Sequence, residues 1–134
     1  MIDNNSPVKI LNQVFGYPRF VGHQEQVIQH IINGGNSLVL MPTGGGKSLC
    51  YQIPALLLPG LTIVISPLIA LMQDQVSALR EAGVRAAAIN SSLSAQDNYE
   101  TKNLIKNNQL DLIYIAPERL LSIDFMCFLN EIKI

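Results

Sequence analysis

A glycine-rich segment at residues 41–48, MPTGGGKS, holds the residues of this sequence that are best suited to bind phosphate. Consecutive glycines let the backbone turn tightly and aim its N–H groups at phosphate oxygens. The lysine would reach the β- and γ-phosphates of a nucleotide, and the serine hydroxyl after it would bind Mg²⁺. The predicted nucleotide-binding residues are Thr43, Gly44, Gly45, Gly46, Lys47 and Ser48, with Lys47 as the catalytic candidate and Ser48 as the magnesium ligand.

The sequence on both sides of this segment is what a phosphate loop requires. Residues 37–41, SLVLM, form a short apolar run typical of a strand buried on both faces, and residues 47–58 have helical length. The pattern GxxxxGK followed by Ser or Thr is matched at its last three positions, whereas Met41 stands where the pattern begins with glycine. A glycine turn with a chance Lys-Ser pair is the alternative, and the strand before and the helix after disfavour it.

Strands and helices alternate along the rest of the chain. Apolar runs predict strands over residues 61–65, 86–89 and 111–115. Helical spacing predicts helices over residues 27–32, 66–83, 95–108 and 125–132. This alternation indicates an α/β fold, a parallel sheet flanked by helices. Open sheets of this kind usually have more than four strands, so we expect the sheet to be incomplete within these residues.

The helix after residue 65 has the clearest start signal. Ser66 would be its N-cap and Pro67 its first residue. Its predicted apolar face, which would run down to a stop at Gly83, comprises Leu68, Leu71, Met72, Val76 and Leu79.

The composition indicates a folded chain with little charge. Hydrophobic residues make up 49% of the 134 residues and charged residues 14%, which excludes disorder. Lys and Arg number 9 against 10 Asp and Glu, so any DNA contact must come from local geometry rather than from net charge. Cys50 and Cys127 lie far apart, which argues against a disulfide framework or a zinc site and suits a reducing cytosol.

Residues 53–72 form an uncharged stretch of about the length that spans a bilayer. Proline and glycine interrupt it at Pro54, Pro59, Gly60 and Pro67, and a helix end, a turn, a strand and a new helix explain these breaks. The first seven residues, MIDNNSP, have no apolar run and do not resemble a signal peptide. We therefore expect no membrane association and no export.

Three segments in order resemble the RecQ family of ATP-dependent DNA helicases. Residues 41–58 are similar to helicase motif I, residues 66–76 (SPLIALMQDQV) to motif Ia, and residues 114–120 (YIAPERL) to motif Ib. The spacing is that of the first RecA-like domain, and the resemblance covers the chain from about Phe15 onward. It implies a P-loop NTPase fold, ATP and Mg²⁺ as cofactors, and 3′ to 5′ movement on single-stranded and partly duplex DNA in recombination and repair.

Residues 15–24, FGYPRFVGHQ, resemble RecQ motif 0, which holds the adenine. Tyr17 would stack on the purine with its flat face, and Gln24 would bond the purine edge with its amide. The family usually has Phe-Arg-Pro-Gly-Gln where this chain has FVGHQ at residues 20–24, so the arginine is missing and Arg19 is a candidate substitute. Without the resemblance, Tyr17 and Gln24 would be ordinary turn and N-cap-region residues.

Two predicted helices begin where strands end, at Ser66-Pro67 and at Ala116-Pro117. The amide groups of such helix starts can hold a DNA phosphate. The resemblance implies that motifs Ia and Ib follow single-stranded DNA in this way, with Ser66, Pro67 and Arg119 as DNA-binding residues. Helix capping explains the same residues without DNA, and for motif Ia the two interpretations remain open.

ATP hydrolysis also needs a carboxylate on a neighbouring strand. Asp111 stands at the start of its strand, away from the phosphates, and Glu118 belongs to a helix start, so neither fits. In RecQ helicases the DEAH motif follows soon afterwards, and the second RecA-like domain brings the arginine finger. We expect both beyond Ile134 and predict that the isolated chain does not hydrolyse ATP.

The predicted organisation has two parts. Residues 1–34 would carry N-terminal helices with motif 0, and residues 35–134 a partial RecA-like ATP-binding domain. The predicted function is the ATP-binding part of a RecQ-type helicase in the bacterial cytoplasm or nucleoid. Another P-loop NTPase, such as a small kinase, and a non-catalytic fragment that binds only nucleotide or nothing are the alternatives.

Overall fold

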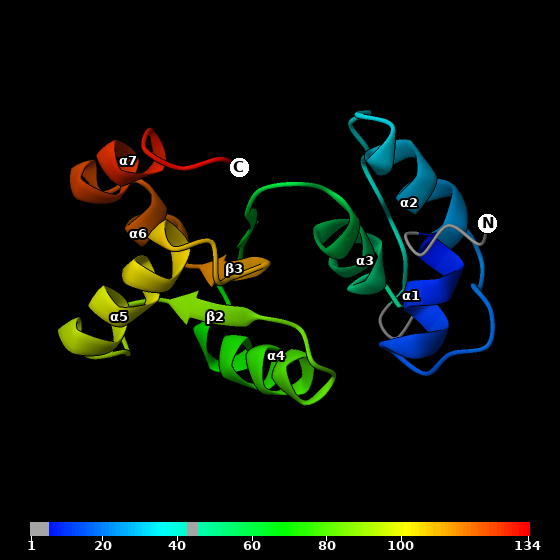
Figure 1. Cartoon of the computed structure of the whole chain (residues 1–134), viewed down its shortest axis with the longest axis horizontal. Coiled ribbons are helices and arrows are strands. Elements are labelled where there is room, and N and C mark those ends of the chain that lie inside the picture. The colour runs from blue at the N-terminus through cyan, green and yellow to red at the C-terminus, as the bar shows by residue number, and fades with distance from the viewer. Residues whose placement is uncertain (1–5, 43–45) are drawn as a thin grey trace. The chain divides into compact units, whose positions relative to one another are not determined.

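The computed structural model describes residues 6–42 and 46–134, and contacts divide the chain into two compact units (Figure 1). The first unit is Met1–Leu58 and the second is Pro59–Ile134. The division between residues 34 and 35 that the sequence suggests remains a prediction.

The described part of the first unit contains the helices α1 (Pro7–Gln13), α2 (Gln24–Ile32) and α3 (Leu49–Leu57). The Ser6 side chain caps α1 by accepting a hydrogen bond from the Lys9 N–H at 3.3 Å. The three helices pack around Leu11, Ile28 and Ile53, all of them fully buried. Gly34 follows the C-cap of α2 and has φ +87°, a conformation that glycine adopts readily at the end of a helix.

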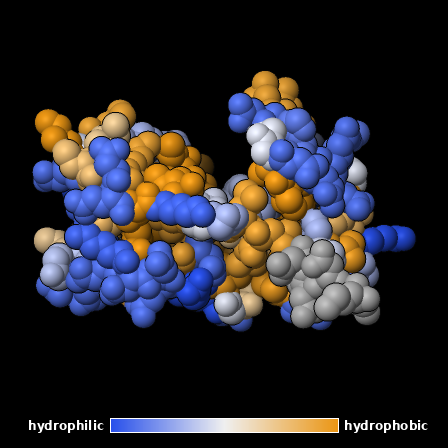
Figure 2. Space-filling view, turned by 45° about the horizontal axis from the view of Figure 1, so that its top comes forward, coloured by the Kyte–Doolittle hydropathy of each residue, from blue (hydrophilic) through white to orange (hydrophobic). Residues whose placement is uncertain are grey.

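The predicted strand over residues 37–41 is not formed in the structure, and this prediction is wrong. Leu38 and Leu40 are 91% and 88% exposed. On the face of the molecule that Figure 2 shows, hydrophobic residues lie beside hydrophilic ones. A strand is stabilised by hydrogen bonds to a neighbouring strand, and no described segment pairs with these residues. The apolar run therefore predicts the tendency to form a strand, but the partner strand decides whether it forms.

A parallel sheet of three strands lies at the centre of the second unit (Figure 1). The strands are β1 (Thr62–Ile65), β2 (Ala86–Ile89) and β3 (Leu112–Ile115), in the order β1-β3-β2. All residues of β2 and β3 are buried, as their continuous apolar sequences predict. The α/β fold with a parallel sheet flanked by helices is thereby confirmed.

Four helices accompany the sheet: α4 (Ile69–Glu81), α5 (Ala95–Lys106), α6 (Pro117–Leu120) and α7 (Ile123–Leu129). Met72, Val76 and Leu79 on α4 are buried, as predicted. Leu68 and Leu71 are 57% and 53% exposed, so the predicted apolar face is too long at its N-terminal end. The helix α4 begins at Ile69 rather than at the proline, so Leu68 lies before the helix, whereas Leu71 lies within it on the exposed side.

The last residues of the chain lie against the start of β1. The Leu61 N–H donates a hydrogen bond to the Lys133 carbonyl at 2.9 Å. A Cβ on Gly60 would lie 3.0 Å from the same carbonyl oxygen, and Gly60 has φ +88°. The close approach and the positive φ explain why glycine stands two residues before this strand.

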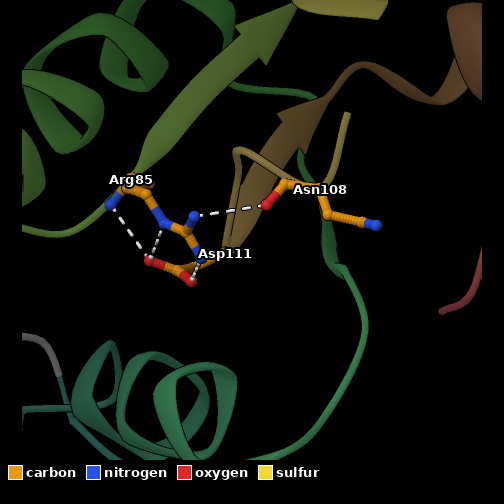
Figure 3. A network of polar contacts seen from close by, with 3 residues as sticks. All are labelled: Arg85, Asn108 and Asp111. Atoms are coloured by element: carbon orange, nitrogen blue, oxygen red, sulfur yellow. Dashed lines mark hydrogen bonds and ion pairs between the residues drawn. The ribbon is translucent and has the colours of Figure 1, made fainter. Parts of the chain in front are cut away.

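An ion pair joins β2 to β3 at the amino ends of both strands (Figure 3). Arg85 Nη2 lies 2.7 Å from Asp111 Oδ1, and Arg85 Nη1 donates to the Asn108 carbonyl at 3.2 Å. The hydrogen bond and the charge of Asp111 raise the pKa of Arg85. Asp111 therefore has a structural partner, and it lies at the sheet edge where the sequence placed it.

None of the helices in the described residues is long and apolar enough to cross a membrane. The uncharged stretch at residues 53–72 is divided among α3, β1 and the start of α4, with turns between them.

Candidate nucleotide-binding site

A cavity of about 250 Å³ lies in the first unit beside the glycine-rich loop. It is lined by Leu11, Tyr17, Arg19, Val21, Gln24, Gly46 and Leu49. These residues come from α1, from the turn between α1 and α2, from the first residue of α2, from the loop before α3 and from the first residue of α3. The structure therefore brings Tyr17 and Gln24 together with the end of the predicted phosphate loop.

The turn that carries Tyr17 is fastened to α1. Asn12 Nδ2 donates hydrogen bonds to the Tyr17 carbonyl at 2.5 Å and to the Pro18 carbonyl at 3.1 Å. The Tyr17 N–H donates to the Leu11 carbonyl at 3.1 Å. With its backbone held and its side chain 54% exposed, Tyr17 presents a ring on which a flat base can stack.

Gln24 connects two segments that line the cavity, the turn at Val21 and the loop at Gly46. Its side chain is 2% exposed, Oε1 accepts the Val21 N–H at 3.0 Å, and Nε2 donates to the Gly46 carbonyl at 3.1 Å. A buried amide whose two ends are bonded in this way is fixed in position. Gln24 thus ties the turn before α2 to the loop before α3.

Gly46, at the described end of the predicted phosphate loop, has a backbone conformation that favours glycine. Gly46 has φ +78°, and a Cβ there would collide with Gln24 Nε2. Lys47 is exposed, and Ser48 precedes α3 without a side-chain capping bond to that helix. Thr43, Gly44 and Gly45, which we predict to bind phosphate, lie outside the described residues.

Groups that could complete a metal site are scarce in the part of the chain that the structure describes. No cluster of three or more His, Cys, Asp or Glu side chains occurs there. Cys50 lies two residues after Ser48 and is buried, and burial raises the pKa of its thiol. The magnesium role of Ser48 stays a prediction.

The predicted DNA-binding residues lie in the second unit, at the carboxyl edge of the sheet. The register pairs Ile65 and Ile89 with Ile115, so the residues that follow the three strands share this edge. Ser66 follows β1, and α6 with Arg119 follows β3. Arg119 Nε is buried and has no hydrogen-bond partner among the described residues.

Ser66 does not cap α4, and this part of the prediction is wrong. Its Oγ accepts the Leu68 N–H at 3.2 Å, which closes a turn before the helix begins at Ile69. A capping bond would instead reach an N–H in the first turn of the helix. The prediction for Pro117 is confirmed, since it is the first residue of α6.

The loop that begins at Asn90, after β2, lies at the same edge and was not predicted from the sequence. Asn90 follows β2 and is 3% exposed, and its Oδ1 accepts the Ser92 N–H at 2.9 Å and the Ser92 hydroxyl at 2.5 Å. Its carbonyl accepts a bond from Asn98 Nδ2 at 3.3 Å. The available signal was the polar run NSS directly after a strand, the same position that Ser66 and Ala116 occupy.

The chain is similar in sequence to known helicases. The family model of the DEAD/DEAH box helicases matches residues 22–133. The ATP-dependent DNA helicase RecQ of Bacillus subtilis is 52% identical over 126 residues, which cover 93% of this chain and 21% of that protein. The protein of the same name from Haemophilus influenzae is 43% identical over 134 residues, which cover 100% of this chain and 22% of that protein.

A plant protein gives a similar result. The ATP-dependent DNA helicase Q-like 5 of Arabidopsis thaliana is 42% identical over 118 residues, which cover 88% of this chain and 13% of that protein. The chain therefore spans about a fifth of the length of its bacterial relatives and less of the plant protein.

Proposed function

Because the chain belongs to the DEAD/DEAH box helicase family, and within it to the RecQ type, we propose that it is the ATP-binding part of a 3′ to 5′ DNA helicase. The observation that carries this proposal is the cavity that joins Tyr17 and Gln24 to Gly46. An exposed aromatic ring beside a glycine-rich loop supports the proposal, because recognition of a nucleotide requires a surface for the base next to a loop for the phosphates.

The size and lining of the cavity fit one part of ATP. Its volume of about 250 Å³ is below the roughly 300 Å³ at which ligand pockets begin, so it suits a base rather than a whole nucleotide. The ribose and phosphates would continue past Gly46 toward Lys47 and Ser48. The Lys47 ammonium would neutralise phosphate charge, and the Ser48 hydroxyl would hold Mg²⁺.

DNA would bind at the carboxyl edge of the sheet in the second unit. Ser66, Pro67 and Arg119 are the proposed contacts, and their position after β1 and β3 at the same edge of the sheet supports this role. Single-stranded and partly duplex DNA in the bacterial cytoplasm or nucleoid would be the substrate. A second RecA-like domain would supply the remaining catalytic groups.

Another P-loop NTPase, such as a small kinase, is the second candidate in the same enzyme class. It would share the loop at residues 41–48 but would not require motif 0 or motif Ia. The family match over residues 22–133 extends far beyond the loop and favours the helicase. A chain that only binds nucleotide remains the alternative outside the enzymes.

Substitution of Lys47 by alanine tests the proposal. In the full-length protein, Lys47→Ala should reduce DNA-stimulated ATP hydrolysis by about a hundredfold or more, since a preorganised charge at a transferring phosphoryl group is lost. Lys106→Ala is the matched control, because Lys106 is an exposed lysine on α5. Equal ATPase rates for the two variants would overturn the proposed role of the loop.

A further inference from the structure

The last turn of α2 is bonded to the chain that leads into the predicted phosphate loop. The Gly35 N–H donates to the His30 carbonyl at 2.9 Å, a hydrogen bond that is common where a helix ends in glycine. The His30 side chain adds a contact that such a helix end does not require. Its ring Nε2 lies 2.8 Å from the Asn36 carbonyl oxygen, and because a carbonyl only accepts, Nε2 is the donor.

Gly35 provides the space for this ring. A Cβ on Gly35 would collide with ring atoms of His30. Gly35 is not among the described glycines with positive φ, so its backbone conformation does not itself require glycine. The imidazole ring therefore explains why residue 35 has no side chain. We call the arrangement of His30, Gly35 and Asn36 the His30 contact.

The segment after the His30 contact has little packing of its own. Leu38 and Leu40 are 91% and 88% exposed, and no described strand pairs with residues 37–41. This segment nevertheless lies near the residue after the loop, because one cavity of about 270 Å³ is lined by Val27, Ile31, Ser37, Val39 and Lys47 among others. A shift of the segment would therefore change the surroundings of the lysine that we propose to bind phosphate.

Helix α2 holds the chain on both sides of the predicted phosphate loop. At its first residue, Gln24 Nε2 donates to the Gly46 carbonyl at 3.1 Å. In its last turn, His30 Nε2 donates to the Asn36 carbonyl. A loop whose two ends are bonded to one helix loses less conformational entropy on closing round a phosphate than a loop that is held at one end.

From these observations we propose that His30 is a positioning residue for the phosphate loop, which fixes the segment before the loop to α2 through the Asn36 carbonyl. The inference rests on the proposed nucleotide-binding function and adds a residue that determines affinity for the phosphates without touching them. Bound phosphates hold the loop in the ground state and in the transition state alike, so His30 affects KM for ATP and not kcat.

Steady-state ATP hydrolysis by the full-length protein with single-stranded DNA separates these two constants. His30→Ala should raise KM for ATP about fivefold, which the loss of one hydrogen bond allows, and leave kcat within about twofold. The inhibition constant of inorganic triphosphate should rise by the same factor, because triphosphate has phosphates and no base. Gln29→Ala is the matched control, since Gln29 is the exposed neighbour of His30 on α2, and it should change neither constant.

The same constants distinguish positioning from a general loss of structure. A partly unfolded variant contains fewer active molecules, so it would show a lower kcat and an unchanged KM. That result for His30→Ala would contradict the inference.

Gly35→Ala tests the contact without removing the imidazole. The added Cβ displaces the His30 ring, so this variant should raise KM by a factor similar to that of His30→Ala. In the double variant His30→Ala with Gly35→Ala no ring is left to displace, so KM should equal that of His30→Ala alone. Losses that multiply would show that the two residues act independently and would overturn the inference.

The kinetic measurements also keep the two proposals apart. Unsubstituted full-length protein without DNA-stimulated ATP hydrolysis would overturn the proposed function and the inference with it. Hydrolysis by the unsubstituted protein, together with an unchanged KM in His30→Ala, would leave the proposed function standing and contradict the role of His30.

Discussion

Gln24 is a polar residue whose removal should affect stability as well as binding. Gln24→Ala leaves the Val21 N–H and the Gly46 carbonyl without their partner and opens a cavity in a buried place. Unpaired groups of this kind cost about 1–3 kcal/mol each, so we expect the free energy of unfolding to fall by about 2–3 kcal/mol. Urea denaturation followed by circular dichroism measures this difference.

Gln26→Ala provides the comparison for Gln24. Gln26 is an exposed residue on α2, and surface substitutions of this type usually change stability by less than about 0.5 kcal/mol. If the two alanine variants unfold at the same urea concentration, the hydrogen bonds of Gln24 do not hold the turn and the loop together.

The two cysteines should differ in reactivity. Cys50 is buried and Cys127 is exposed, and burial raises the pKa of the Cys50 thiol. Because the thiolate is the reactive form, alkylation of Cys50 should be slower at neutral pH and should increase only at a pH above the ordinary range of a thiol. Mass spectrometry of iodoacetamide-treated protein, with Cys127→Ser as the second sample, follows each site. Faster labelling of Cys50 would show that α3 is not packed as described.

At the level of single residues, the sequence indicates the proposed binding residues but not the residues that hold them in position. Tyr17 and Gln24 could be found because the family pattern marks them, and the structure places both on one cavity with Gly46. Asn12 could not be found, because its bonds go to carbonyls five and six residues away and depend on how the intervening turn is closed. A sequence pattern records residue types but not the direction in which a turn points its carbonyls.

Among the secondary-structure elements, β2 and β3 depend on one ion pair for part of their alignment. Asp111→Asn removes the charge that faces Arg85, whose side chain is 55% exposed. An exposed pair of this kind contributes about 0.2–1 kcal/mol, so we expect a loss within that range that shrinks at high salt. Thermal unfolding at low and high salt measures it, and Asp74→Asn on the exposed side of α4 is the control.

The pH dependence of this pair follows from the direction of the shift. The pKa of Arg85 is raised, so the stability that its charge contributes is fully present below the ordinary pKa of arginine. That contribution is lost only as the pH rises through the raised value, in strong alkali. Between neutral pH and about pH 10, unfolding temperatures of the unsubstituted protein and of Asp111→Asn should therefore differ by a constant amount as far as Arg85 is concerned.

Helices and strands differ in how far the sequence determines them. The bounds of α5 and β2 agree with the predictions to within two residues, α5 being capped by Ser94 and β2 being paired with β3. Residues 37–41 have an equally good strand sequence and form none. The difference is that hydrogen bonds within a helix come from its own residues, whereas those of a strand come from another segment.

For the whole molecule, the main prediction concerns activity of the 134 residues alone. Phosphoryl transfer requires a magnesium-binding carboxylate and a cation at the transition state, and we expect both from other parts of the helicase. An arginine finger alone is worth about 10³ to 10⁵ in rate. The isolated chain should therefore bind ATP without DNA-stimulated turnover. An ATPase assay with and without single-stranded DNA measures this, and robust stimulation would show that the catalytic carboxylate lies within the chain.

The contact between Leu61 and Lys133 makes one amide proton a reporter on the end of the chain. The Leu61 N–H donates its hydrogen bond to the carbonyl of Lys133, which is far away in the sequence. Exchange of this amide proton with deuterated solvent requires that carbonyl to move away. A slow exchange rate at Leu61 would thus record how often residues 133–134 leave the start of β1. Substituting Gly60 by a larger residue would push against the same carbonyl and should speed that exchange without touching the strand ladder itself.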